Sequence, residues 1–304
     1  MQMYQVRAEL LRDNELRFAP DGQTLAVGGV PYLVLDLATG SQRDLHEMGR
    51  GSWAWAFVRG GTALAHLPTT AILNVLDLVT GAVETHPVGG AARGMIASPD
   101  GRTLYLSVGG ANFGKASEIR ALDAATLKPV AAFAHVADYL GRFAVSGDGR
   151  QLAVSGGNWN ASLKERGLTF RVYDFGDGGI PEQPTAFIEL ERPVNGFALT
   201  HNGAHLAVVN GHGLALWAAA GDPPVKRSPA PRSGVLSVAC SPTLPHVLTG
   251  NKAGFVALWD TAGRVLRRYE WGLAEVIGLA FAPDGLRAAA IDATGKVVVW
   301  DADG

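Results

Sequence analysis

The feature that most constrains the fold is a short turn motif that returns along the whole chain. Its clearest copies are Phe18-Ala-Pro-Asp-Gly22, Ser98-Pro-Asp-Gly101 and Phe281-Ala-Pro-Asp-Gly285. With the proline position as the anchor, seven copies of varying quality fall at residues 20, 59, 99, 147, 201, 242 and 283 of the 304-residue chain. Most copies are about 40 residues apart, a period typical of repeat folds in which each unit supplies one small sheet.

The residues around each turn predict the same order of strands in every repeat. An apolar strand precedes the turn, a second strand follows it, and a third strand ends in an aromatic residue or leucine, usually followed by aspartate. A further turn such as Thr39-Gly40 leads into a fourth strand. Short strands punctuated by turn residues, without helical periodicity, indicate an all-β fold. We therefore predict one domain over residues 1–304, a seven-bladed β-propeller with four antiparallel strands per blade.

The chain also contains a segment that can close the predicted ring. The last repeat ends one strand short, just after Trp300-Asp301, while residues 4–11 precede the first blade. The apolar residues of this segment alternate toward one face, at Tyr4, Val6, Ala8 and Leu10. We expect residues 4–11 to form the outermost strand of blade 7, because an unclosed ring leaves an open sheet edge. A disordered N-terminal tail is the alternative.

These residues resemble the WD-repeat family, and the resemblance covers the whole chain. It rests on the repeat period and on the two Trp-Asp strand endings, Trp259-Asp260 and Trp300-Asp301. The family's Gly-His pair before the first strand is absent, and Ala253 and Thr294 stand where the family has aspartate six residues before the tryptophan. The resemblance implies a propeller used for protein interaction. These departures imply that the family's buried His-Ser-Asp-Trp network is missing.

Composition and charge exclude several classes of partner. The formal net charge is −2, which gives no general attraction for nucleic acid or for an anionic membrane. The single cysteine, Cys240, excludes an intramolecular disulfide and is expected to be a small buried apolar residue. The N-terminal residues lack the apolar run of a signal peptide, so we expect a cytoplasmic protein. We also expect a monomer. The excess of arginine over lysine favours a GC-rich bacterial source.

Two long loops on one face of the ring are candidate partner-binding segments. The loops between the second and third strands and the segments that lead into each first strand share one face, here called the top face. In blades 3 and 4 these loops are long and carry large apolar side chains among glycine and polar residues, which favours a covering partner. The alternative is that the aromatic ring of each of these side chains folds back over its own blade. The candidate residues are Phe113, Asn158, Trp159 and Lys164.

Arginines precede the first strand in most blades and predict a positive collar on the top face. Arginine binds carboxylate and phosphate groups through two parallel hydrogen bonds, so the collar favours an acidic peptide or an anionic small molecule. Local pairing with nearby carboxylates, at Asp13, Glu47, Asp138, Glu191 and Glu275, is the alternative. Trp53 and Trp271 lie on the same segments and could add to this surface. The collar consists of Arg12, Arg50, Arg93, Arg142, Arg192 and Arg232.

No motif in the sequence indicates catalysis. A nucleophile elbow, a phosphate loop and a zinc-protease motif are all absent, and the aspartates of the Pro-Asp-Gly turns are explained by turn formation. Only His201 and His205 are spaced closely enough to share a metal ion, and two ligands make a weak site. We therefore expect no catalytic residues, cofactor or metal, and favour a protein-interaction platform. The alternative is a lactonase-like hydrolase acting at the mouth of the central channel, since fold alone does not decide function.

Overall fold

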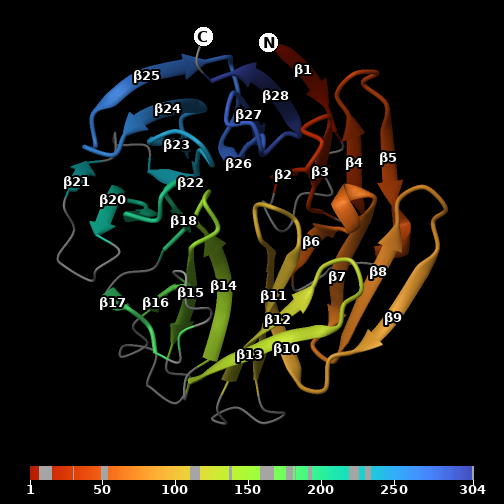
Figure 1. Cartoon of the computed structure of the whole chain (residues 1–304). Helices are drawn as coiled ribbons and strands as arrows, with labels where there is room; N and C mark the ends of the chain where they lie inside the picture. Colours follow the sequence, from red (N-terminus) through yellow and green to blue (C-terminus); the bar gives the residue numbers. More distant parts are fainter. Residues whose placement is uncertain are drawn as a thin grey trace. The chain divides into compact units, whose positions relative to one another are not determined.

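A computed structural model describes the chain over residues 1–6, 16–29, 31–48, 54–109, 117–136, 139–157, 168–175, 181, 183–190, 194–218, 226–229 and 234–302. The described residues form seven sheets, each of four antiparallel strands (Figure 1). The fold is the predicted seven-bladed β-propeller. In this part of the chain no helix has both the length and the apolar composition that crossing a membrane requires.

The chain divides into two compact units, so a single domain over residues 1–304 stays a prediction. The first unit comprises residues 1–46, 146–148 and 194–304 and holds blades 1, 5, 6 and 7. Blade 1 consists of β2 (Leu16–Phe18), β3 (Thr24–Val27), β4 (Tyr32–Asp36) and β5 (Gln42–Leu45). Blade 5 consists of β18 (Gly196–Leu199), β19 (His205–Asn210), β20 (Gly213–Ala218) and β21 (Lys226–Pro229). Blade 6 consists of β22 (Val235–Cys240), β23 (His246–Asn251), β24 (Phe255–Asp260) and β25 (Val265–Glu270). Blade 7 consists of β26 (Val276–Phe281), β27 (Arg287–Asp292), β28 (Lys296–Asp301) and β1 (Gln2–Gln5).

The second unit comprises residues 47–145 and 149–193 and holds blades 2, 3 and 4. Blade 2 consists of β6 (Trp55–Val58), β7 (Ala63–Thr69), β8 (Ile72–Asp77) and β9 (Val83–Pro87). Blade 3 consists of β10 (Ala91–Ala97), β11 (Thr103–Gly109), β12 (Ser117–Asp123) and β13 (Pro129–Val136). Blade 4 consists of β14 (Tyr139–Val145), β15 (Gln151–Gly157), β16 (Leu168–Asp174) and β17 (Ala186–Leu190). Two short 3₁₀ turns, η2 (His46–Met48) and η3 (Arg59–Gly61), complete the described elements.

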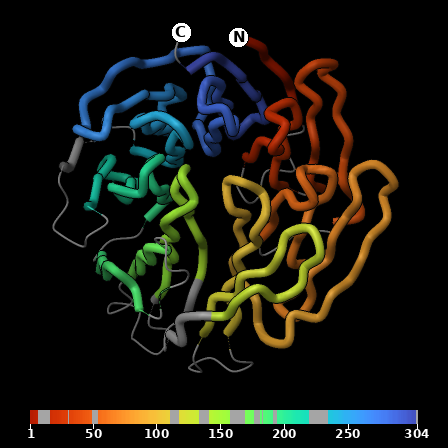
Figure 2. The backbone as a smooth tube through the Cα atoms, viewed as in Figure 1, coloured from red at the N-terminus to blue at the C-terminus, as the bar shows by residue number. Residues whose placement is uncertain are grey.

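The N-terminal strand completes the last blade, as predicted, but its bounds differ. Strand β1 pairs with β28 from Gln2↔Val299 to Gln5↔Lys296, and Figure 2 shows the two chain ends side by side. The ladder ends at Gln5 because its partner Lys296 is the first residue of β28, and Val6 N then donates to Gly295 O at 2.8 Å. Of the predicted residues 4–11, only Tyr4 and Gln5 lie in the strand, and residues 7–11 lie outside the described part.

Strand β1 also fastens blade 7 to blade 1 inside the first unit. The Tyr4 hydroxyl donates to Leu37 O at 2.9 Å, and Gln42 Nε2 donates to Gln5 O at 2.9 Å. Val6 is buried in the apolar core that blades 7 and 1 share, together with Val297. Similar cores lie between successive blades within each unit, and the predicted core residue Trp55 is buried.

The repeated aspartates hold the turns, as the sequence predicts. In the first turn, Asp21 Oδ1 accepts hydrogen bonds from the backbone N–H groups of Gln23 and Thr24, at 2.7 Å and 3.0 Å. The third strands of blades 1, 2 and 3 end in a second repeated turn, in which the aspartate side chain accepts three hydrogen bonds. One comes from the backbone N–H two residues later, and the other two come from the backbone N–H and the hydroxyl of the threonine three residues later. These bonds hold the carboxylate pKa below its ordinary value at Asp36, Asp77 and Asp123.

The hairpin turns between the first and second strands contact one another within the first unit. Asp148 N donates to His201 O at 2.8 Å, and Thr243 Oγ1 donates to Asp284 O at 3.2 Å. The turn that contains Gly147 packs so tightly on Pro242 that an added Cβ would lie 1.9 Å from the proline carbonyl oxygen. These turns therefore pack on one another at the hairpin end of the first strands.

Candidate functional site

Most of the predicted site residues lie outside the described residues. Of the predicted partner-binding set, the structure describes Arg93, Arg142 and Trp271. The others, together with Arg12 of the collar, receive no structural test and stay predictions. They are Arg50, Trp53, Phe113, Asn158, Trp159, Lys164, Arg192 and Arg232.

Arg93 and Arg142 both lie at β-bulges near the start of their strands. In β10 the ladder passes from Ala92↔Val108 to Gly94↔Ser107, which leaves Arg93 without an opposite residue. In β14 it passes from Leu140↔Gly156 to Phe143↔Val154, so that Gly141 and Arg142 together oppose one residue. A bulge of this kind changes the direction of a side chain, and bulges are over-represented next to active sites.

The two bulges contact each other across neighbouring blades. Strands β10 and β14 are the first strands of blades 3 and 4, and they lie against each other. At their contact, a Cβ added to Gly94 would lie 1.9 Å from Gly141 O and 3.1 Å from Ser107 Oγ. Only a residue without a side chain allows this approach. The structure therefore brings Arg93 and Arg142 to either side of one backbone contact.

A serine fixes the bulge in blade 4. Ser155 Oγ accepts a hydrogen bond from Arg142 N at 2.9 Å and lies 3.2 Å from Arg142 O, to which its hydroxyl donates. Ser155 is buried, and Ser107, which opposes the bulge of blade 3, is buried as well. One hydroxyl thus satisfies the N–H and C=O groups that the bulge removes from the ladder, and the backbone under Arg142 is held in place.

Blades 6 and 7 contain the same bulge without an arginine. Their ladders skip Leu236 in β22 and Ile277 in β26. Both of these residues are half-buried, whereas Arg142 is exposed and Arg93 is half-buried. An arginine is therefore not needed to form the bulge. Of the carboxylates expected to neutralise the collar, Glu275 forms its ion pair with Lys252, at 3.6 Å.

Trp271 lies in an aromatic cluster on blades 6 and 7. Its ring stacks on Tyr269 with a centroid distance of 5.1 Å and meets Trp300 at 4.7 Å, and the rings of Tyr269 and Trp300 are 5.5 Å apart. These distances are those of direct aromatic packing and leave no room for a ligand between the rings. Trp271 is half-buried, so only part of its ring is available to the surface.

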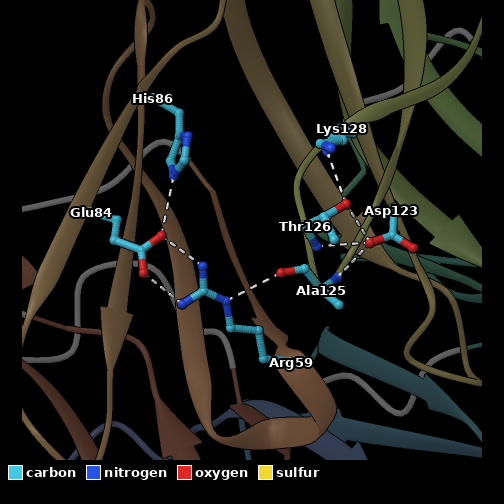
Figure 3. A network of polar contacts seen from close by, with 7 residues as sticks. All are labelled: Arg59, Glu84, His86, Asp123, Ala125, Thr126 and Lys128. Atoms are coloured by element: carbon cyan, nitrogen blue, oxygen red, sulfur yellow. Dashed lines mark hydrogen bonds and ion pairs between the residues drawn. The ribbon is translucent and has the colours of Figure 1, made fainter.

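A polar network on blades 2 and 3 was not found by the sequence analysis (Figure 3). Arg59 forms two parallel hydrogen bonds to Glu84, at 2.9 Å and 2.6 Å, and its Nε donates to Ala125 O of blade 3 at 3.3 Å. His86 Nε2 lies 3.6 Å from the same Glu84 carboxylate. The hydrogen bonds from Arg59 hold the pKa of Glu84 below its ordinary value.

The backbone on both sides of this network is unusual. Among the described residues, Arg59 and Leu127 are the non-glycine residues with positive φ, at 53° and 58°. Leu127 belongs to the turn in which Asp123 accepts bonds from Thr126, and Lys128 N donates to Thr126 Oγ1 at 3.4 Å (Figure 3). Left-handed backbone at such residues costs free energy, which the surrounding contacts must offset. The hydrogen bond from Arg59 to Ala125 O therefore fastens blade 2 to blade 3.

One tryptophan of the third strands forms a buried hydrogen bond to a hydroxyl group. In blade 6, Trp259 Nε1 donates to Thr249 Oγ1 on the neighbouring strand at 2.8 Å. Val208 and Ala290 take the corresponding position in blades 5 and 7, where Trp217 and Trp300 carry buried Nε1 groups without a partner. This hydroxyl is ten residues before the tryptophan and lies on the neighbouring strand, so the residues that directly precede the tryptophan do not predict the bond.

Burial shifts the pKa values of two further titratable side chains, Cys240 and His66. In the described part of the chain, no group of three or more His, Cys, Asp or Glu side chains is arranged to hold a metal ion. Burial raises the pKa of the Cys240 thiol to about 12, so the thiolate is not formed near neutral pH. His66 is fully buried in blade 2, neither ring nitrogen has a hydrogen-bond partner, and burial lowers its pKa to about 4.

His66 makes the stability of the fold depend on pH. Its folded pKa of about 4 lies below the ordinary value of 6.5, so protonation favours the unfolded chain. The free energy of unfolding is therefore highest above pH 6.5, where His66 is neutral in both the folded and the unfolded chain. It decreases as the pH falls from 6.5 toward about 4, because the unfolded chain then binds a proton that folded His66 does not. Between pH 7.5 and pH 5 we expect a loss of about 2 kcal/mol from this residue.

Urea unfolding of the wild type and of His66→Leu at both pH values measures this contribution. Leucine is a suitable replacement because Leu106 takes the corresponding position in blade 3. The pH-dependent loss should shrink by about 2 kcal/mol in the variant. An equal loss in both proteins would show that His66 is already protonated, or accessible to water, in the folded state.

Comparison with known proteins supports the fold and leaves the family open. No family model matches the chain, and no curated protein matches its sequence. Among solved structures the chain is similar to hydrazine synthase of Kuenenia stuttgartiensis, with a TM-score of 0.69 and 16% sequence identity over 97% of this chain and 97% of that chain. In total 1604 chains of known structure match, so the likeness identifies a widespread fold and does not select a function.

Proposed function

We propose that this chain is a divergent WD-repeat propeller that acts as a non-enzymatic platform for a protein partner in the cytoplasm, and that the partner binds at the top face. The adjoining bulges that present Arg93 and Arg142 are the observation that carries the proposal. Binding residues work best when a rigid scaffold holds them. The Gly94–Gly141 contact and the Ser155 bonds supply that scaffold here.

The chemistry of the other described polar groups supports a binding role over a catalytic one. The turn aspartates Asp36, Asp77 and Asp123 use their oxygens to accept backbone and threonine bonds. Their pKa values are lowered, whereas a general acid or base at neutral pH needs a raised carboxylate pKa. The alternative, a lactonase-like hydrolase, would require titratable groups that converge at the mouth of the central channel.

Charge reversal of arginines in blades 3 and 4 tests the proposal, with variants at the bulges and control variants beside the hairpin turns. Tagged wild type, Arg93→Glu and Arg142→Glu are used to capture partners from the native lysate, and bound proteins are quantified by mass spectrometry. The matched controls are Arg102→Glu and Arg150→Glu, exposed arginines beside the hairpin turns of the same two blades. We expect at least one protein that the wild type and both controls capture and that the two bulge variants lose. Equal capture by all five proteins would refute a partner at the bulges.

A further inference from the structure

Strand β1 leaves one edge of the blade 7 sheet open. It is the last strand in the order β26-β27-β28-β1, and among the described residues no further strand pairs with it (Figure 1). Gln2, Met3 and Gln5 are exposed, and so is Met1, which precedes the strand. An open edge with unpaired N–H and C=O groups is a template for another strand, and proteins commonly protect such edges with charged residues or proline.

The other outer strands carry this protection and β1 does not. Strands β5, β9, β17, β21 and β25 each contain at least one charged residue, and β13 begins with Pro129. Strand β1 reads Gln-Met-Tyr-Gln, without charge or proline. Pairing of β25 with its own copy would gather Arg267 and Arg268 of both chains, whereas β1 pairs with its own copy without bringing like charges together.

The hydrogen bonds of β1 show which of its backbone groups point to the open edge. Val6 N donates to Gly295 O on the β28 side at 2.8 Å, and Gln5 O accepts from Gln42 Nε2 at 2.9 Å. Because alternate residues of an antiparallel strand bond toward opposite sides, the N–H and C=O of Met3 and the N–H of Gln5 point to the open edge. Since Gln42 occupies the C=O of Gln5, the stretch left for pairing ends there and is centred on Met3.

Met1 and Met3 give this edge an apolar face. Residues at alternate positions of a strand share one face, and these two side chains are 68% and 48% exposed. Met3 is opposite Val298, which belongs to the apolar core that blades 6 and 7 share. Directly opposite residues also share a face, so Met3 extends the row from Val298 to the open edge. An apolar residue placed beside Met3 would continue that core.

We infer that β1 pairs edge to edge with β1 of a second copy, in antiparallel register about a twofold axis at Met3. Each Met3 N–H donates to the Met3 C=O of the other copy, and each Gln5 N–H donates to the Met1 C=O of the other copy. The two blade 7 sheets then form one continuous sheet, in which the methionine side chains cover one another. This dimer replaces the monomer expected from the sequence, because the open edge exists only once β1 is set against β28.

Sedimentation velocity over a range of protein concentrations tests the dimer. The paired strands are short, so the interface belongs to the small, weak class, and we expect the wild type to pass from monomer to dimer between about 1 and 500 µM. Met3→Lys should weaken dimerisation by about tenfold or more, because two ammonium groups meet at the axis and an apolar contact is lost. The matched control is Val265→Lys on β25, where the replaced side chain is 53% exposed, and it should change dimerisation by less than about twofold.

Two results of this experiment would contradict the inference. A wild type that stays monomeric at every concentration would overturn the second copy as occupant and leave the edge to a strand of another protein. A Met3→Lys dimer as strong as the wild-type dimer would place the interface elsewhere on the surface.

Cysteine cross-linking tests the register. In the inferred dimer the two Met3 Cα atoms are about 5.5 Å apart, within the range of a disulfide, whereas the two Gln5 Cα atoms are about 14 Å apart. Under mild oxidation with diamide, Met3→Cys should therefore form the linked dimer at least about tenfold faster than Gln5→Cys. The wild type, which keeps Cys240, gives the background rate. Equal rates at the two positions would exclude pairing centred on Met3.

Met3→Pro separates dimerisation from closure of blade 7. The Met3 N–H points away from β28, so proline removes the donor at the dimer axis and no bond of the closing strand. We expect dimerisation to weaken by about tenfold or more, with an unchanged urea midpoint at concentrations where the wild type is monomeric. A lower midpoint would place the Met3 N–H on the β28 side and overturn the register, and undiminished dimerisation would overturn the pairing itself.

Discussion

Gly94→Ala is expected to lower the free energy of unfolding by about 4 kcal/mol or more, at the upper end of single-substitution effects. The added Cβ would lie 1.9 Å from Gly141 O, 3.0 Å from Gly141 C and 3.1 Å from Ser107 Oγ. Two of these atoms are backbone, so no rotamer change relieves the clash. Strand β10 or β14 must shift, and the packing between blades 3 and 4 must open with it.

Gly211→Ala is the matched control for this substitution. Nothing lies within 4 Å of a Cβ added at Gly211, and its φ is outside the left-handed region. Alanine there should leave the stability unchanged or raise it by about 0.5 kcal/mol through lower entropy of the unfolded chain. Urea unfolding of both variants gives the comparison. If Gly94→Ala were as stable as Gly211→Ala, the two bulges would not touch, and Arg93 would not lie beside Arg142.

The blade architecture was predictable because the turns of each blade are determined by residues that are close together in the sequence. The Pro-Asp-Gly turn at residues 20–22 fixes one hairpin, and the Asp36 turn fixes the next through bonds that span only three residues. Repetition of such local signals at a constant period gives both the number of strands and the number of blades. The closing strand was also predictable, because the last repeat is visibly one strand short.

Details that depend on neighbouring strands or blades were not predictable in the same way. The bounds of β1 follow from where β28 begins, which the sequence of residues 4–11 does not contain. The bulge at Arg93 appears only when β10 is set against β11, and the approach of Gly94 to Gly141 joins residues of two different sheets. In blade 2 the turn motif reads poorly at Arg59, because that position serves an ion pair with Glu84 on another strand.

The candidate site was predicted in part. The residue type and the strand position of Arg93 and Arg142 suggested a positive surface, and the structure places the two at adjoining bulges. Trp271 was expected to be freer for a partner, but its ring packs on Tyr269, two residues before it, and on Trp300 of the neighbouring blade 7. A single sequence shows which residues start each strand. It does not show which of their side chains are already packed against neighbouring residues and so are not available to a partner.

Asp292 is a buried carboxylate at the end of β27 with every oxygen occupied. Its Oδ1 accepts bonds from Thr294 N at 2.8 Å, Thr294 Oγ1 at 2.6 Å and Lys296 N at 2.9 Å, and its Oδ2 accepts one from Ala274 N at 2.8 Å. Burial raises the pKa of Asp292, but these hydrogen bonds outweigh burial and hold the pKa below its ordinary value. The carboxylate thus joins the β27–β28 turn to the segment that leads into β26.

Asp292→Ala should therefore lower the free energy of unfolding by about 4 kcal/mol, because it leaves three backbone donors and one hydroxyl without their acceptor. Asp292→Asn should recover little of this loss, since the amide NH₂ would face either the N–H of Ala274 or the three donors at Oδ1. Asn251 takes the same place in blade 6 and accepts one backbone bond, from Ala253 N at 2.8 Å, so Asn251→Ala should cost only about 1 kcal/mol.

Urea unfolding at neutral pH ranks the three variants, and repeating it in acid adds a second readout. A carboxylate with a lowered pKa stabilises the fold above its unfolded pKa, and this stabilisation is lost as the pH falls through the folded pKa. The difference in the free energy of unfolding between the wild type and Asp292→Ala should therefore become smaller in acid. An equal cost for Asp292→Ala and Asn251→Ala would mean that the turn can satisfy its donors without the carboxylate, for example with water. The junction of blades 6 and 7 would then depend on the apolar core that the two blades share, which includes Val276 and Trp300, and on its other hydrogen bonds, such as the one from Ser237 Oγ to Val276 O.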